Sequence, residues 1–179
     1  MGLRLAPSYV PSPPPVGPAM LELAALKPGE TLLDLGCGDG RLLKLAVRRF
    51  GAARATGYEL EGDLVDAARA LCSDYPAITI HQRDALQAEE CLKSADVVAL
   101  YLTEKGNANV LPMLRTSLQR PGARVVSYCW GMGADIPPSR TARVTGDGVV
   151  LNFSGPNILL WNREDLRCGP ANAEVSTPD

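Results

Sequence analysis

Apolar runs of strand length alternate along the chain with segments whose apolar residues recur every three to four positions. The runs at 32–35 and 95–102 are apolar enough for strands buried on both faces. After the first run, Leu43, Ala46 and Phe50 recur at helical spacing, with basic side chains on the other side. The pattern predicts helices at 19–26, 41–50, 63–73 and 109–118, strands at 32–35, 53–60, 78–81 and 95–102, and a turn and strand over 121–127.

Turn and capping residues complete this prediction. Asp63 is placed to cap the helix at 63–73, and Gly146 and Gly148 predict a hairpin turn. Residues 128–139 contain too much glycine and proline for a long helix, and 169–179 have the composition of a disordered tail. The turn at 146–148 therefore joins strands at 142–145 and 149–153, and a further strand is predicted at 157–161.

The stretch 34–41 joins the first strand to the first amphipathic helix and opens a βαβ unit. Ligands of such units bind beyond the carboxyl ends of the strands. Its glycines, Gly36, Gly38 and Gly40, permit positive φ and let a ligand approach the backbone. A dinucleotide fingerprint has a third glycine where this chain has Arg41. Asp34 would repel a pyrophosphate but suits a ligand that carries an ammonium and a sulfonium group.

The run from Asp34 to Arg41, with Cys37 between its first two glycines, resembles the first motif of class I S-adenosylmethionine (SAM) dependent methyltransferases. That resemblance implies that SAM is the cofactor and S-adenosylhomocysteine its product. An oxidoreductase that uses NAD(P) is the competing interpretation of the glycine loop.

Two acidic residues follow the second and third predicted strands. Glu59 lies at the tip of its strand, where a carboxylate can accept both ribose hydroxyls, and Leu60 can pack on an adenine face. The simpler interpretation of Glu59 is an exposed glutamate. In SAM-dependent methyltransferases an aspartate at the position of Asp84 commonly accepts the adenine amino group, while the next backbone N–H, here that of Ala85, meets the ring. Asp84 could also cap the next helix.

Composition indicates an ordinary globular protein of one domain, with 179 residues, 46% hydrophobic and 21% charged. The formal net charge of −2 gives no general attraction to nucleic acid. Five cysteines, spaced too widely for a metal-binding pair, predict reduced and mostly buried thiols, and His81 is expected to be structural at a strand end. We expect no metal, no transmembrane segment and no secretory signal, and an intracellular, cytoplasmic location.

The proline-rich stretch 7–18 is predicted to be extended. Its composition alone favours a flexible tail or a ligand for an aromatic groove. The predicted organisation is an arm at 1–18, a catalytic domain at 19–168 and a tail at 169–179.

Several motifs together resemble one family, the small class I methyltransferases related to the mitochondrial lysine methyltransferases of the ATP synthase c subunit and the adenine nucleotide translocase. They are Tyr9-Val10-Pro11-Ser12-Pro13, the glycine motif ending in Gly38-Asp39-Gly40-Arg41, Gly57-Tyr58-Glu59-Leu60, Tyr101-Leu102 with Asn107, and the segment from Pro121 to Ser127.

The resemblance implies an α/β, Rossmann-like class I methyltransferase fold, with a mostly parallel seven-stranded sheet, an antiparallel C-terminal hairpin and helices on both faces. It favours an arm that folds over the cofactor with Tyr9 as its aromatic contact, and it also allows a mitochondrial location. The implied cofactor contacts are Asp34, Gly36, Cys37, Gly38, Glu59, Leu60, Asp84, Ala85 and Tyr101.

The function implied is direct, in-line methyl transfer to a lysine of a protein substrate. Tyr101, Glu104, Asn107 and Tyr9 are the candidates to hold the amine. After the fourth strand the chain lacks the Asn/Asp-Pro-Pro-Tyr/Phe element of enzymes that methylate exocyclic amines of bases, so nucleic acid is not the expected partner. A small metabolite or RNA as acceptor, or a SAM-binding module without catalysis, are the alternatives.

Overall fold

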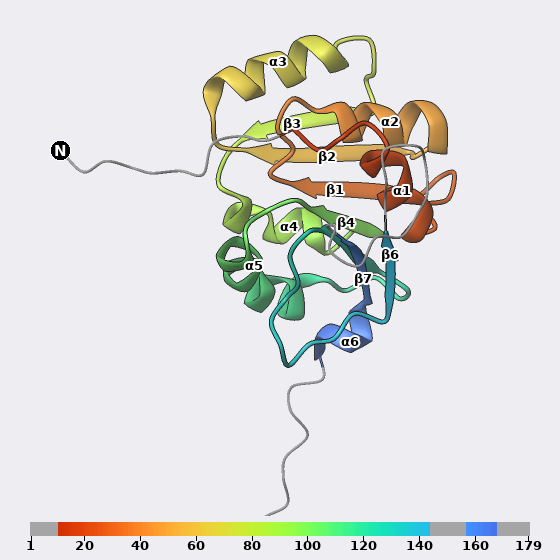
Figure 1. The fold of residues 1–179 in the computed structure, drawn as a ribbon. Helices are drawn as coiled ribbons and strands as arrows, with labels where there is room; N and C mark the ends of the chain where they lie inside the picture. The colour runs from red at the N-terminus through yellow and green to blue at the C-terminus, as the bar shows by residue number, and fades with distance from the viewer. Residues whose placement is uncertain (1–10, 144–156, 168–179) are drawn as a thin grey trace, which may run out of the picture.

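The computed structural model describes residues 11–143 and 157–167, and these form one α/β unit (Figure 1). Its strands are β1 (Thr31–Leu35), β2 (Arg54–Glu59), β3 (Ile78–Gln82), β4 (Val97–Leu100), β5 (Arg124–Tyr128), β6 (Arg140–Arg143) and β7 (Asn157–Asn162). Its helices are α1 (Val16–Leu23), α2 (Arg41–Phe50), α3 (Gly62–Cys72), the 3-10 turn η1 (Ala85–Gln87), α4 (Glu89–Leu92), α5 (Glu104–Ser117) and α6 (Arg163–Arg167).

The strands form one sheet in the order β3-β2-β1-β4-β5-β7-β6. Strands β1 to β5 are mutually parallel, and β7 runs antiparallel to both β5 and β6. This confirms the predicted fold class. The strand order reverses between β1 and β4, and in open α/β sheets the crevice at such a reversal is where ligands bind.

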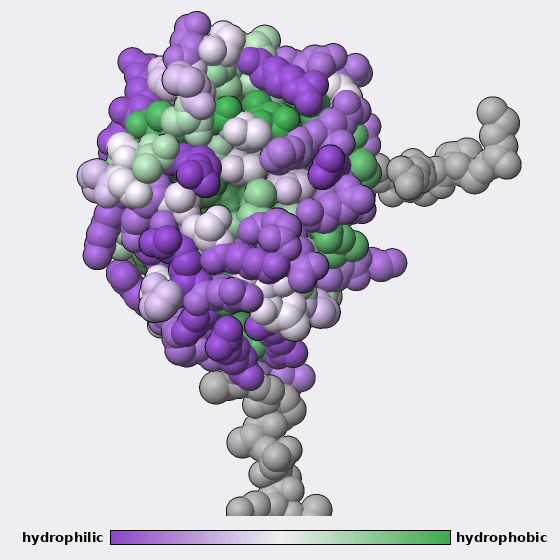
Figure 2. All heavy atoms as spheres, turned by 180° about the vertical axis from the view of Figure 1, so that it is seen from behind, coloured by the Kyte–Doolittle hydropathy of each residue, from purple (hydrophilic) through white to green (hydrophobic). Residues whose placement is uncertain are grey.

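Helices cover the sheet in two layers (Figure 1). Helices α1, α2 and α3 pack together over one set of strands, whereas α5 contacts α4, α6 and η1. Two buried clusters match these layers, one containing Leu21 and Leu43 and the other containing Leu114 and Trp161. The strands alternate side chains between the two clusters, so the central strands are buried on both faces, as their apolar sequences predicted. Hydrophilic residues predominate on the face drawn in Figure 2, with small hydrophobic patches between them.

Three local predictions are wrong. The stretch predicted to be extended to residue 18 becomes helical at Val16, because a helix accepts proline in its first turn and Pro18 needs no N–H there. The helix predicted from 109 begins at Glu104, since Thr103 caps it by accepting a hydrogen bond from the Gly106 N–H at 3.1 Å. Asp63 is not the cap of α3, which begins after Glu61 and places Asp63 in its first turn.

At the C-terminal end, β6 and β7 pair with each other, so the antiparallel hairpin joins 140–143 to 157–162. The predicted strand at 149–153, its glycine turn, the arm up to Val10 and the tail from 169 lie outside the described residues. Four of the cysteines are described, and all four are free thiols, with Cys37 and Cys72 buried and the other two half-buried.

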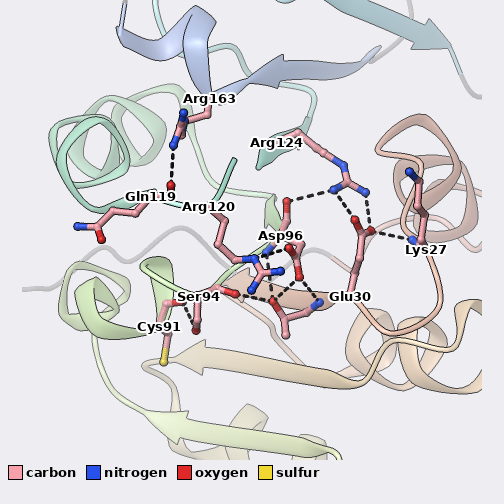
Figure 3. Close-up of polar contacts among 10 residues, drawn as sticks. Lys27, Glu30, Cys91, Ser94, Asp96, Gln119, Arg120, Arg124 and Arg163 are labelled. Carbon is pink, nitrogen blue, oxygen red and sulfur yellow. Dashed lines mark hydrogen bonds and ion pairs between the residues drawn. The ribbon is translucent and has the colours of Figure 1, made fainter. Parts of the chain in front are cut away.

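The end of the sheet where the parallel strands begin is closed by a polar cluster around Arg124 (Figure 3). Its guanidinium donates to both Glu30 carboxylate oxygens, at 2.9 and 2.6 Å, and to the carbonyl oxygens of Ala24 and Ala25 at 2.6 and 2.7 Å. Nearby, the Asp96 carboxylate accepts from the Thr31 N–H at 2.8 Å and pairs with Arg120 at 2.6 Å. The opposite end of the sheet, on the left of Figure 1 where the arrowheads of β1, β2 and β3 lie, is free to form a site.

Candidate active site

A cleft of about 610 Å³ opens at the carboxyl ends of β1, β2, β3 and β4, at the point where the strand order reverses. This volume is within the range of small-molecule sites. Its walls are Gly36, Tyr58, Glu59, Leu60, Glu61, Leu64, Arg83, Asp84, Ala85, Leu86, Tyr101, Leu102, Thr103, Lys105, Gly106, Asn109, Val110 and Trp130.

The glycine loop is fastened to the end of β2. The N–H groups of Gly36 and Cys37 both donate to the Tyr58 carbonyl oxygen, at 2.9 and 3.0 Å. Gly36 has a φ of 86°, and a Cβ there would lie 2.8 Å from Leu102 Cδ2. Any side chain would therefore push into the cleft wall, which gives the first glycine of the motif a steric reason. Cys37 itself is buried behind the loop and does not line the cleft.

The Glu59 carboxylate lies at the tip of β2 and joins three backbone groups. Its Oε2 accepts from the Gly38 N–H at 2.9 Å, and its Oε1 accepts from the Leu60 and Glu61 N–H groups at 2.7 and 3.0 Å. A carboxylate has about four lone-pair positions, so acceptor capacity is left for a ligand. The side chain is thus held facing the cleft and is not a mobile surface glutamate.

Asp34 is buried in β1, with 5% of its surface exposed. Burial, and then the nearby Glu59 and Asp39 carboxylates, raise the pKa of Asp34 to about 7. It stands behind the cleft wall and does not line it directly. Asp39 is paired with Arg41 at 2.6 Å, so Glu59 on the cleft wall, with Asp34 behind it, makes this end of the cleft favourable for a cation.

The third wall combines a carboxylate with apolar side chains. Asp84 accepts a hydrogen bond from the Leu86 N–H at 2.9 Å and caps η1, so the capping role considered for it is present. Asp84 and Ala85 both line the cleft. Leu60 and Leu86, 49% and 48% exposed, lie on the same cleft, and exposed leucines of this size provide an apolar surface for a flat ligand.

Aromatic residues form the side of the site next to β4 and β5. Tyr101 follows β4, lines the cleft and packs on Tyr128 with ring centroids 5.0 Å apart. Burial and then Cys129 raise the pKa of Tyr128 to about 12, and the same causes raise the pKa of Tyr101. Both hydroxyls are therefore neutral at physiological pH.

The remaining predicted amine contacts are not all gathered at the cleft. Glu104 is exposed in the first turn of α5, between the lining residues Thr103 and Lys105, and Tyr9 lies outside the described residues. Asn107 is 0% exposed, and its amide donates to the Trp130 and Gly131 carbonyl oxygens at 2.8 and 3.2 Å. Its N–H groups are thus engaged, whereas its buried Oδ1 has no hydrogen-bond partner among the described residues, so a role of Asn107 in holding the amine stays a prediction.

Sequence reasoning missed Leu86, Lys105 and Trp130, which all line the cleft. Leu86 follows the motif residues Asp84 and Ala85 directly, so its position was available from the strand end. Lys105 belongs to the segment 101–107 after the fourth strand, so its proximity to the site was available as well. Trp130 depends on where the chain turns after β5, and the sequence carries no short-range signal for that turn.

The fold, the strand order and the glycine loop define a class I SAM-dependent methyltransferase. Residues 34–139 match the model of the ANTKMT methyltransferase domain, and the chain belongs to that family. The site residues fit the cofactor: Gly36 offers an approach that a Cβ would block, the Glu59 carboxylate on the wall suits a cationic ligand, and the exposed leucines give an apolar wall.

Relatives and solved structures agree on the class. The chain is 32% identical over 123 residues to a protein-lysine N-methyltransferase of Saccharolobus islandicus, covering 67% of this chain and 74% of that protein. It is also similar to the crystal structure of an RNA methyltransferase from Salinibacter ruber in complex with S-adenosyl-L-homocysteine, with 35% identity, a TM-score of 0.73, and coverage of 86% of this chain and 93% of that chain. A ribosomal protein L11 methyltransferase of Thiobacillus denitrificans is 31% identical over 105 residues, which is 58% of this chain and 34% of that protein.

The described residues contain no group of three or more His, Cys, Asp or Glu side chains placed to hold a metal ion. Within the described part of the chain, every helix is too short or too polar to cross a bilayer.

Proposed function

We propose that this protein is a protein-lysine N-methyltransferase. The observation that carries the proposal is the similarity to the lysine methyltransferase of Saccharolobus islandicus, which extends over 74% of that protein. The aromatic side of the cleft supports it, because a lysine must shed water from its alkyl stem before its amine can react, and aromatic rings supply the apolar surface for that stem.

The cofactor would be held at the end of the cleft formed by β1, β2 and β3. Glu59 would accept the ribose hydroxyls, Leu60 would cover the adenine, and the buried Asp34 would balance the positive charge. Bound SAM supplies an activated methyl group, so the protein needs alignment and electrostatics more than covalent help. The full proposed set is Asp34, Gly36, Cys37, Gly38, Glu59, Leu60, Asp84, Ala85 and Tyr101, of which Asp34 and Cys37 stand behind the cleft wall and would act from there.

The chain must also deliver the lysine amine in its neutral form. Taking a lysine from a pKa near 10.4 to the neutral form at pH 7 costs about 4 to 5 kcal/mol, and burial among apolar side chains lowers that cost. The neutral Tyr101 hydroxyl and Tyr9 would orient the amine. Glu104, exposed beside the cleft, would attract the lysine cation before it enters.

A second candidate is RNA methylation. The structure from Salinibacter ruber is described as an RNA methyltransferase and has 35% identity to this chain. The cleft carries both signs of charge, with Arg83 and Lys105 on its walls beside Glu59, Glu61 and Asp84. A basic track for a polynucleotide would have an excess of cations, so we favour the protein acceptor.

Transfer of label from methyl-labelled SAM into a cell lysate separates the candidates. We expect label that survives nuclease, is lost with protease and is recovered as methyl-lysine after acid hydrolysis. Label removed by nuclease would overturn the lysine proposal in favour of RNA, and label only in the small-molecule fraction would favour a metabolite. SAM binding without any transfer would identify a binding module. The Glu59→Ala variant serves as the control for other methyltransferases in the lysate.

A further inference from the structure

Trp130 occupies an unusual position for a tryptophan. It lies two residues beyond β5, is 46% exposed and forms part of the cleft wall. The other tryptophan of the chain, Trp161, is 0% exposed and donates its indole N–H to the Ile136 carbonyl oxygen at 3.0 Å. An exposed indole at a cleft is a surface prepared for a ligand, because leaving it in water costs hydrophobic free energy.

The backbone that carries Trp130 is strained. Its N–H donates to the Tyr128 carbonyl oxygen at 3.0 Å, across Cys129, whose φ is 71°. This is a γ-turn with a non-glycine residue in the left-handed region, a conformation that persists only when its surroundings hold it. The Cys129 N–H is fixed in turn by the Asn157 carbonyl oxygen at 2.9 Å.

Hydrogen bonds from the Asn107 side chain hold the turn at Trp130 in place. Its side-chain amide donates to the Trp130 carbonyl oxygen at 2.8 Å and to the Gly131 carbonyl and Ser127 hydroxyl oxygens at 3.2 Å. The Ser127 hydroxyl donates to the same Trp130 carbonyl oxygen at 2.8 Å. Among the described residues, the buried Asn107 Oδ1 has no hydrogen-bond partner. A buried oxygen without a hydrogen-bond partner lowers the stability of the fold. The contribution of Asn107 therefore lies in the hydrogen bonds that its amide N–H groups donate to the turn.

The strand order indicates whether Trp130 lies on the cofactor side or on the acceptor side of the cleft. Glu59 ends β2 and Asp84 follows β3, on one side of β1, whereas Tyr101 and Trp130 follow β4 and β5, on the other side. All of the proposed cofactor contacts except Tyr101 lie near β1, β2 and β3. The aromatic wall by β4 and β5 is therefore the place for the acceptor, and an indole face attracts both a cation and the alkyl chain that bears it.

We propose that Trp130 contacts the methyl acceptor and determines its specificity as the surface on which an amine-bearing alkyl side chain packs, and that Asn107 is the positioning residue that holds Trp130 in the cleft. The inference rests on the proposed lysine specificity for the identity of the acceptor. The position of Trp130 on the acceptor side does not depend on it.

Two measurements test the role of Trp130. The first is methyl transfer into nuclease-treated lysate protein, titrated to find the half-saturating acceptor concentration, and the second is the SAM dissociation constant by calorimetry. Trp130→Ala should raise the half-saturating concentration about 3- to 30-fold, Trp130→Phe should restore most of it, and the SAM dissociation constant should stay unchanged in both. Unaltered transfer by Trp130→Ala, or an equal loss of SAM binding, overturns the proposal.

Fluorescence tests the role of Asn107 without any acceptor. In the Trp161→Phe background, Trp130 is the only tryptophan, and acrylamide quenching reports its exposure. Adding Asn107→Ala should change the quenching constant and raise the half-saturating acceptor concentration, with SAM binding retained. Should that variant fail to fold, Ser127→Ala removes one bond of the same clamp. Quenching and acceptor dependence that stay unchanged in a folded variant rule out the positioning role.

If the label in the lysate proves to be in RNA, the same Trp130 variants are assayed with nuclease-accessible RNA in place of protein. An effect there refutes the lysine acceptor and the amine-packing surface together, but retains Trp130 as an acceptor contact. If the Trp130 variants change methyl transfer into neither protein nor RNA, Trp130 is not a contact of the acceptor.

Discussion

The Glu59 carboxylate accepts a hydrogen bond from the Gly38 N–H at 2.9 Å and so ties the tip of β2 to the glycine loop that follows β1. Two further backbone N–H groups fix the same carboxylate. The strongest candidate for ribose binding is therefore preorganised, and a ligand need not order it on arrival.

Replacing Glu59 should remove most of the affinity for SAM. A hydrogen bond to a charged group contributes about 1.5 to 3 kcal/mol, which corresponds to about 10- to 150-fold in affinity. Calorimetry of Glu59→Ala measures the loss, with circular dichroism to show that the fold is kept. Glu22→Gln, a change at an exposed position on α1, is the matched control and should leave the affinity unchanged. Full affinity in Glu59→Ala would remove Glu59 from the site.

Asp34→Asn should stabilise the protein at high pH and not at low pH. The folded pKa of about 7 lies above the ordinary value of 3.8, so ionising the buried carboxyl costs the folded state roughly 4 kcal/mol above pH 7. Below pH 4 both states are protonated and the cost vanishes; between the two values, stability falls as pH rises. Urea unfolding at pH 4 and pH 8 measures how much the free energy of unfolding of Asp34→Asn exceeds that of the unsubstituted protein. This gain should be larger at pH 8, with roughly 4 kcal/mol as its upper value. An equal gain at both pH values would show that charge is not its cause.

Gly57→Ala should be strongly destabilising. A Cβ at this position in β2 would lie 2.5 Å from Cys37 Sγ and 2.7 Å from Leu43 Cδ1, both in the core. Overpacking of this kind costs about 1 to 3 kcal/mol. Gly122→Ala is the control, because Gly122 has a φ of 73° but nothing within 4 Å of its Cβ position. Equilibrium unfolding should show a larger loss for Gly57→Ala, and a larger loss for the control would contradict the steric argument.

Arg124→Lys should lower stability and leave methyl transfer intact. The Arg124 and Glu30 side chains are only 12% and 21% exposed, and a lysine cannot reproduce the planar fork. We expect a loss of about 2 to 4 kcal/mol by urea unfolding.

The loss of stability at acid pH provides a second test of the Arg124–Glu30 pair. Burial raises the pKa of Glu30, but hydrogen bonds from Arg124 and the Lys27 N–H outweigh it and the net shift is downward. The resulting stabilisation is present above pH 4.5 and is lost as the pH falls through the lower, folded value. The variant should lose less stability over that range. Arg49→Lys, in an exposed pair with Glu22, should change stability by under about 0.5 kcal/mol.

Most of the central fold could be predicted from the sequence because its signals are local. The apolar runs of β1 and β4 and the glycine loop carry their own periodicity and turn chemistry. The start of α5 was missed because Gly106 and Asn107 are poor helix formers, and only the Thr103 cap and the packing of Asn107 behind Trp130 make them helical.

The candidate site divides in the same way. Asp34, Gly36 and Glu59 follow from motif spacing at strand ends. The contacts of Asn107 could not be predicted, because its partners, at 127, 130 and 131, are brought to it by the pairing of β4 with β5. Such a contact depends on the finished sheet, and no window of sequence contains it.

The hydrogen bonds of Arg124 to Ala24 and Glu30 span 100 and 94 positions of the chain. During synthesis, which proceeds from the N-terminus, Glu30 and Asp96 emerge long before the guanidinium that neutralises the first of them. Closing a loop of this length is entropically costly, so the α1–β1 corner gains its arginine only when β5 joins the sheet. The docking of β5 therefore completes the α1–β1 corner, and a chain cut before residue 124 should remain susceptible to proteolysis at that corner.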